Sequence, residues 1–139
     1  MNCTPDFDQN APFISALMSE ITSLLGDLAA SGKEGVIDLR GLPLLDQDKK
    51  QLEDLLGRGE VSALVNAMGE TQIWETAYAG VWWLRHKDTE DKIISEQIAI
   101  TLIPELLKSH SADVEGSFER LQNIFEGEDK MEDGNSHDH

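Results

Sequence analysis

The chain has 139 residues, of which 40% are apolar and 27% charged, and 11 basic against 27 acidic residues give a formal net charge of −16. A chain of this length is expected to form one domain whose core buries roughly two-thirds of the unfolded surface. The acidic balance argues against nucleic-acid binding and against docking on anionic lipid, because both need clustered Lys and Arg side chains. It favours solubility and attraction of a basic partner.

The cysteine content and the first residues indicate a compartment. The one cysteine, Cys3, excludes a disulfide framework and cannot make a thiolate metal site by itself. No apolar run approaches the roughly 20 residues of a membrane span, so no membrane contact is expected. The acidic start lacks the basic-then-apolar order of a signal peptide. These features predict a cytoplasmic protein, and no cofactor is expected.

The first half of the chain predicts two helices separated by a short strand. Apolar residues recur at helical spacing over 13–28, with Pro12 at the start and Gly32 at the end. A strand is expected over 36–40, and a second helix from Asp46 to Gly57 with its leucines inward. The predicted solvated face of that helix comprises Asp48, Lys49, Lys50, Glu53 and Asp54.

The second half of the chain predicts three successive strands. Residues 61–68 are apolar on both faces, which is typical of a strand covered on one or both sides. Residues 71–87 are too long for an ordinary strand, so we expect a bulge or bend at Ala79–Gly80, with a hairpin there as the alternative. A further strand is expected over 93–103.

A last helix and the strand order complete the predicted fold. The helix begins at Ser111 or Asp113 and turns its apolar residues inward, namely Val114, Phe118, Leu121, Ile124 and Phe125. We expect a disordered segment at 1–10, a single α+β domain at 11–126 and an acidic disordered tail at 127–139. Sequential strands usually pair antiparallel. The prediction is therefore a two-layer α+β sandwich, with helices on one face of a four-stranded, mostly antiparallel sheet.

Glu96 is an anomaly, because it falls on an otherwise apolar strand face. A buried carboxylate must be paired, hydrogen-bonded or protonated. Its candidate partners from neighbouring strands are Arg58, Arg85 and His86. One interpretation is a structural ion pair or a strand end in water; the other is acid–base or metal chemistry shared with Glu60 and Glu75. The sequence offers no nucleophile with a nearby base, so we expect no enzyme.

Aromatic residues gather in the same stretch. Trp74, Tyr78 and Trp82 share one strand parity, and Trp83 has the other. Either all four fill the core, or at least one stays accessible beside Arg58. Exposed Trp and Tyr side chains beside an Arg often dominate contacts between proteins. The second interpretation predicts a surface for binding another polypeptide.

Several blocks occur in a characteristic order and spacing. They are Val36-Ile37-Asp38-Leu39-Arg40-Gly41, Gly57-Arg58-Gly59-Glu60-Val61, Gly80-Val81-Trp82-Trp83, Glu96-Gln97-Ile98 and Ile103-Pro104-Glu105. With them, residues 20–125 resemble the C-terminal domain of the HupH/HyaF-type hydrogenase expression/formation proteins. The resemblance implies an accessory protein of nickel–iron hydrogenase maturation, acting as an assembly chaperone for a hydrogenase subunit precursor before export.

The resemblance and the charge together define the leading hypothesis and its alternative. An acidic domain would attract the basic leader of an exported small subunit. The candidate partner-binding residues are Arg58, Glu60, Glu75, Tyr78, Trp82, Trp83 and Glu96. The alternative is a metal- or cofactor-handling domain with Glu60, Glu75, Glu96 and His86 as ligands, although soft metals usually need more Cys and His. A homodimer formed through an edge strand is left open.

Overall fold

The computed structural model describes residues 12–137 and divides the chain into two compact units, the first ending at Pro104 and the second beginning at Glu105. The predicted disordered segment at 1–10 lies outside the described residues. The helices of the first unit are α1 (Pro12–Ser31), η1 (Leu39–Gly41) and α2 (Asp46–Leu56). Its strands are β1 (Gly35–Asp38), β2 (Ser62–Asn66), β3 (Glu70–Glu75), β4 (Val81–Lys87) and β5 (Ile93–Ile100).

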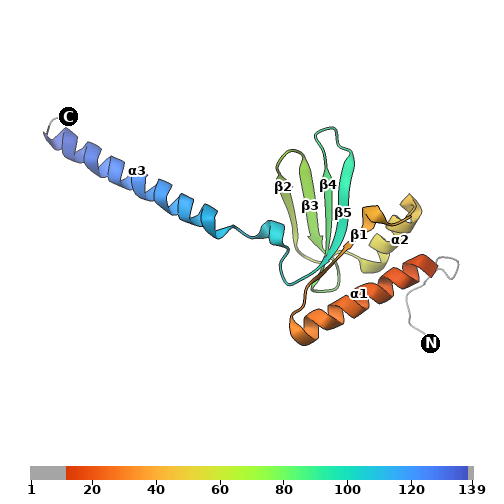
Figure 1. Ribbon diagram of the computed structural model, residues 1–139. Helices are drawn as coiled ribbons and strands as arrows, with labels where there is room; N and C mark the ends of the chain where they lie inside the picture. The colour runs from red at the N-terminus through yellow and green to blue at the C-terminus, as the bar shows by residue number, and fades with distance from the viewer. Residues whose placement is uncertain (1–11, 138–139) are drawn as a thin grey trace. The chain divides into compact units, whose positions relative to one another are not determined.

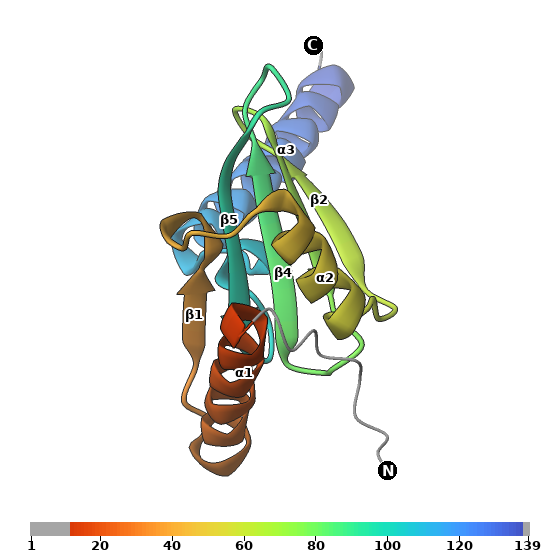
Figure 2. The same ribbon diagram turned by 90° about the vertical axis from the view of Figure 1, so that its right-hand side faces the viewer.

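The strands form a single five-stranded sheet in the order β1-β5-β4-β3-β2, and all neighbouring strands are antiparallel. Both α1 and α2 cover the same face of this sheet (Figures 1 and 2). The predicted α+β class with helices on one face of an antiparallel sheet is confirmed. The sheet has one more strand than predicted, because residues 71–87 form two strands.

A hairpin joins β3 to β4, so the predicted bend within a single strand is wrong and the alternative is right. Thr76 N donates to Val81 O at 2.9 Å, and Val81 N donates to Tyr78 O at 3.0 Å. Gly80 has a φ of 92°, a conformation that residues with a Cβ rarely adopt. The chain can therefore reverse direction within a few residues at this point.

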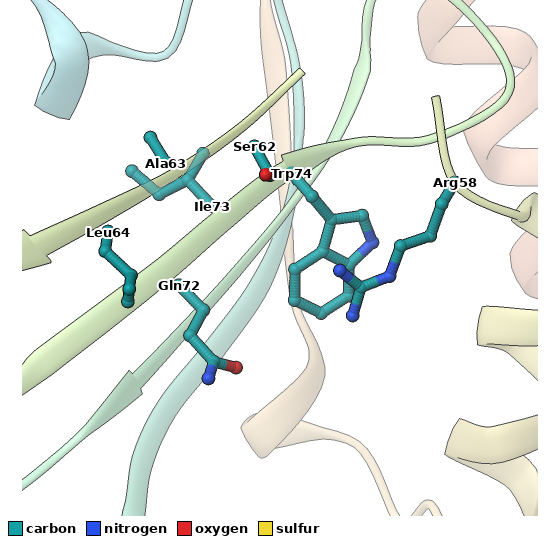
Figure 3. Close-up of a pocket in the computed structure, with 7 residues that line it drawn as sticks. All are labelled: Arg58, Ser62, Ala63, Leu64, Gln72, Ile73 and Trp74. Atoms are coloured by element: carbon teal, nitrogen blue, oxygen red, sulfur yellow. The ribbon is translucent and has the colours of Figure 1, made fainter. Parts of the chain in front are cut away.

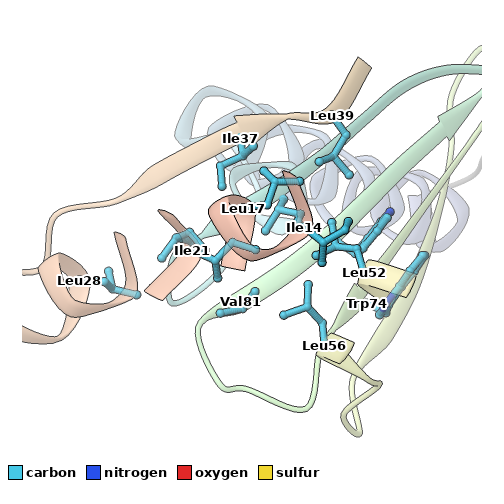
Figure 4. Packing of buried hydrophobic residues seen from close by; sticks show 13 residues of the cluster. Ile14, Leu17, Ile21, Leu28, Ile37, Leu39, Leu52, Leu56, Trp74 and Val81 are labelled. Atoms are coloured by element: carbon cyan, nitrogen blue, oxygen red, sulfur yellow. The ribbon is translucent and has the colours of Figure 1, made fainter. Parts of the chain in front are cut away.

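The core lies between the sheet and the two helices that cover it (Figure 4). The buried residues of α1 are Ile14, Leu17, Ile21 and Leu28, and those of α2 are Leu52 and Leu56. They pack with the sheet residues Ile37, Trp74, Val81, Trp83, Ile98 and Ile100. The helical spacing in the sequence thus identifies the face that becomes buried.

Helix α1 corrects the expectation that no segment approaches the length and apolar composition of a membrane span. By length and composition alone, Pro12–Ser31 is apolar enough to cross a membrane. The core helix of a folded domain meets the same criterion, and the buried residues of α1 belong to the core cluster.

Strand β2 differs from the prediction of a covered strand. It is the last strand at one edge of the sheet. Leu64 is 60% exposed, and Val61, just before the strand, is 45% exposed. The apolar run therefore lies at an edge, where one side has no neighbouring strand.

The second unit contains η2 (Glu105–Leu107) and α3 (Ser111–His137) in its described part. The apolar residues Val114, Phe118, Leu121, Ile124 and Phe125, which were predicted to face inward, are all more than half exposed and have no core to face within the described part of this unit. The described part of this unit has no further helix or strand that could cover the stripe. A disordered tail was predicted over 127–139, but α3 continues as a helix to His137.

Candidate functional site

A buried ion cluster centred on Glu96 links α2 to the sheet. Glu96 is fully buried and accepts three hydrogen bonds. Arg85 Nε and Trp83 Nε1 donate to its Oε2 at 2.7 and 2.9 Å, and Lys49 Nζ donates to its Oε1 at 3.1 Å. Arg85 Nη2 also donates to Glu53 Oε2 at 2.7 Å. We call Lys49, Glu53, Trp83, Arg85 and Glu96 the Glu96 cluster.

Backbone register places the members of this cluster. Arg85 on β4 lies directly opposite Glu96 on β5, and Trp83 has the same parity as Arg85. Lys49 and Glu53 are four residues apart on α2, a spacing that puts both side chains on one helix face. Both were predicted to belong to a solvated face, which is right for Lys50 and Asp54. Lys49 and Glu53 instead turn toward the sheet and are two partners of the cluster that the strand pattern could not reveal.

The charged groups of the cluster stabilise one another in their ionised forms. Burial alone would raise the pKa of Glu96, but the hydrogen bonds from Arg85 and Trp83, the charge of Arg85 and the hydrogen bond from Lys49 together hold it below its ordinary value. Burial alone would lower the pKa of Arg85, but Glu96 and Glu53 raise it. Glu96 and Arg85 are therefore both ionised at neutral pH. Of the three predicted partners, Arg85 forms the ion pair.

Arg58 has a different role, because it lies on an aromatic stack. Its guanidinium carbon is 3.9 Å from the centroid of the Trp74 ring. The Trp74 and Trp83 rings stack with centroids 5.7 Å apart and planes 7° apart. A guanidinium over an indole face is attracted by the ring quadrupole. The stack joins the loop after α2 to the Glu96 cluster through Trp83.

Two glycines hold this loop against the end of β3. Gly57 ends α2 with a φ of 67°, and its N–H donates to Glu53 O at 2.8 Å. Gly59 N donates to Glu75 O at 2.8 Å, and a Cβ on Gly59 would lie 2.6 Å from Thr76 O. Only a residue without a side chain fits that approach. The pair of glycines thus determines where Arg58 lies.

An open groove of about 300 Å³ lies beside this loop (Figure 3). Its lining residues are Arg58, Ser62, Ala63, Leu64, Gln72, Ile73 and Trp74. These residues come from the loop after α2 and from β2 and β3, at the free edge of the sheet. Sequence reasoning identified Arg58 but missed Leu64, because residues 61–68 were predicted to be covered, and it contained no signal for Gln72.

Three predicted contact residues are buried, which corrects the interpretation of accessible tryptophans. Trp83 and Glu96 are fully buried within the cluster. Trp82 is 5% exposed on the other face of the sheet, and its Nε1 donates to Thr101 O at 3.1 Å. Their position on strands flanked by neighbours on both sides explains the burial. They stabilise the fold and do not present a surface to a partner.

The other four candidates lie near one end of β3. Arg58 and Glu60 belong to the loop that Gly59 joins to Glu75 by a backbone hydrogen bond. Tyr78 lies in the β3–β4 hairpin turn and is 47% exposed. The adjacent Ala77 N donates to Leu56 O at 2.9 Å. The loop and the hairpin turn are thus joined. Of these four candidates, Arg58 is the one that lines the groove.

The ligand set of the metal-handling alternative is not brought together. Glu96 is occupied by cations and an indole N–H, whereas His86 lies on the opposite sheet face, with its Nδ1 2.6 Å from Thr71 Oγ1. Within residues 12–127, whose side chains the structure describes, no group of three or more His, Cys, Asp or Glu side chains is arranged to hold a metal ion. The proposed set Glu60, Glu75, Glu96 and His86 is therefore wrong as a single site.

Comparison with known proteins agrees with this fold. The chain matches the model of the HupH hydrogenase expression protein, C-terminal conserved region, over residues 9–127. It is similar to the solved structure of the hydrogenase expression protein HupH from Thiobacillus denitrificans, with 34% identity and a TM-score of 0.79, covering 86% of this chain and 98% of that one.

Two curated relatives carry related names. The hydrogenase expression/formation protein HupQ of Azotobacter chroococcum is 33% identical over 70% of this chain and 34% of its own length. The protein HupH of Rhodobacter capsulatus is 30% identical over 84% of this chain and 41% of its own length. The chain thus spans about a third to two-fifths of these relatives. These matches show that the chain belongs to the HupH hydrogenase expression protein family, through its C-terminal conserved region.

Proposed function

We propose that this protein is a non-catalytic assembly chaperone of hydrogenase maturation, acting in the cytoplasm on a hydrogenase subunit precursor. Membership of the HupH family and the names of its relatives support a role in hydrogenase formation. The exported small subunit is the leading candidate, because a basic leader complements a chain of net charge −16.

The groove at the β2 edge is the observation that carries this proposal. The groove combines the exposed side chain of Leu64, the guanidinium of Arg58 on the Trp74 ring and the amide of Gln72. A few large side chains that pack in a partly apolar groove usually supply most of the binding energy between two proteins. The buried Glu96 cluster holds the supporting strands and the Arg58 loop in place, so the surface is preformed.

Binding of the purified full chain to the small-subunit precursor tests the proposal. Affinity should fall steeply between about 50 and about 500 mM salt, because the attraction between an acidic protein and a basic leader is screened. Precursor without its leader should bind more weakly and with less salt dependence. Absence of binding, or salt-independent binding, would count against the proposed function.

A matched pair of variants locates the binding surface. Leu64 and Val36 are exposed to nearly the same extent, 60% and 59%, on the two opposite edge strands. Leu64→Ser should weaken precursor binding at least about tenfold, or about 1.4 kcal/mol, whereas Val36→Ser should leave it unchanged. If the two substitutions changed the affinity for the precursor equally, the precursor would contact a surface other than the groove.

A further inference from the structure

Among the strands that the structure describes, none pairs with the outer edge of β2. In an antiparallel pair, alternate residues direct their N–H and C=O groups toward the partner strand. Val61 O accepts from Glu75 N at 2.9 Å, and Ala67 N donates to Gly69 O at 3.0 Å. The odd-numbered residues therefore face β3. The even-numbered residues Ser62, Leu64 and Asn66 direct their N–H and C=O groups away from the sheet.

This edge lacks the features that usually prevent pairing with another chain. Edge strands are commonly protected by charged side chains, by Pro, by bulges or by a covering helix. Residues 61–69 contain no charged residue and no proline, although more than a quarter of the whole chain is charged. The β2–β3 register runs without a shift from Ser62 to Asn66, and these two residues and Leu64 are exposed. The edge is regular, uncharged and accessible.

We propose that β2 accepts an extended segment of the client polypeptide as a sixth strand of the sheet, a mode that rests on the proposed chaperone function. Strand addition obtains its affinity from backbone hydrogen bonds and its specificity from pockets for alternate side chains. The backbone groups are those of Ser62, Leu64 and Asn66. The groove beside Leu64 and Trp74 receives side chains of the added strand on the same sheet face as the Glu96 cluster.

Charge distinguishes a client segment from a second copy of this chain. Each copy carries a net charge of −16, and a large net charge opposes self-association. Glu60 precedes the uncharged run and Glu70 follows it. The segment that fits has apolar residues at its centre and Lys or Arg near its ends. An unfolded or leader-bearing precursor offers such extended segments, whereas a finished fold hides them.

Proline substitutions at the outward-facing positions test this mode of binding. Pro removes one N–H and is tolerated on edge strands where that N–H faces solvent. Ser62→Pro combined with Asn66→Pro should preserve the fold and weaken binding of the small-subunit precursor at least tenfold. Ser62→Thr combined with Asn66→Thr changes the same side chains but keeps both N–H groups, so it should bind like the wild type.

Amide hydrogen exchange on the unmodified protein gives a second measurement that does not depend on the fold of a variant. The amides of Ser62, Leu64 and Asn66 should exchange rapidly in the free protein and become protected when precursor is bound. Those of Ala63 and Val65 should be protected in both states. Unchanged exchange at the three outward amides, or a proline variant that binds normally, overturns strand addition while leaving the chaperone function intact. A wild-type protein that binds no precursor overturns both.

Discussion

Arg85 and Glu96 lie directly opposite each other on β4 and β5, and Arg85 Nε donates to Glu96 Oε2 at 2.7 Å. The same guanidinium reaches Glu53 on α2 through Nη2. One arginine thus joins two strands and a helix in the interior. Helix α2 leads directly into the loop that carries Arg58, one of the residues that line the groove.

Removing the central arginine should destabilise the fold strongly. Arg85→Met leaves Glu96 buried with fewer cationic partners, and breaking a buried ion pair in this way costs about 3 kcal/mol or more. The matched control is Lys50→Ala, which breaks an ion pair with Asp54 whose side chains are 73% and 66% exposed. That change should cost less than about 0.5 kcal/mol. Urea unfolding followed by tryptophan fluorescence measures both, and equal losses would contradict the structural role of Arg85.

The Glu96 carboxylate should make stability depend on pH in acid. Its folded-state pKa is below the ordinary value of 4.5. Near that value the unfolded chain therefore binds more protons than the folded chain, so the stabilisation is present above about pH 4.5 and lost as pH falls through the folded-state pKa.

Comparison with Glu96→Gln isolates this group from the other carboxylates. Their mutual repulsion also changes in acid, but it changes almost equally in the two proteins. The difference in unfolding free energy should be largest near neutral pH and shrink as the pH falls below about 4.5. A difference that stays constant over this range would show that Glu96 is not a depressed, ionised carboxylate in the folded state.

Trp82 should behave as a core residue, whereas Tyr78 should behave as a surface residue. Trp82 is 5% exposed and donates to Thr101 O, so Trp82→Ala should cost about 3–5 kcal/mol of unfolding free energy. Tyr78 is 47% exposed, and Tyr78→Ala should cost less than about 1 kcal/mol. Thermal or urea unfolding of the two variants checks this order. A stable Trp82→Ala protein would mean that the indole is accessible after all.

The two glycines Gly59 and Gly26 should respond oppositely to alanine. A Cβ on Gly59 would lie 2.6 Å from the backbone oxygen of Thr76, so Gly59→Ala must displace the Arg58 loop and should cost about 1–3 kcal/mol. Gly26 is exposed within α1, and its added Cβ would meet nothing within 4 Å. Gly26→Ala should therefore stabilise by about 0.5–1 kcal/mol. Unfolding curves of both variants measure these changes. A Gly59→Ala protein as stable as the wild type would contradict the claim that a Cβ at this position displaces the Arg58 loop.

Local patterns predicted much of the fold because each reports a property of a few neighbouring residues. The 3.6-residue spacing of Ile14, Leu17, Ile21 and Leu28 identified the buried face of α1. The alternation along β5 identified Glu96 as a charged residue on an otherwise apolar strand face. The same reasoning failed for 71–87, because Gly80 is compatible with a bulge or with a reversal, and only pairing of β3 with β4 distinguishes them.

The sequence by itself determined the class of the fold, the burial of α1 and α2 on one face, the charged residue at the centre of β5 and the strongly acidic surface. The tertiary structure decided which residues contact one another. Helix α2 brings Lys49 and Glu53 to the Glu96 cluster, Trp82 and Trp83 are buried, and β2 lies at an edge of the sheet. The physical reason is that the spacing of apolar residues along the sequence reports only which side of one helix or strand a residue occupies. Which residues of different elements contact one another depends on which elements lie side by side. That arrangement follows from the order of strands in the whole sheet.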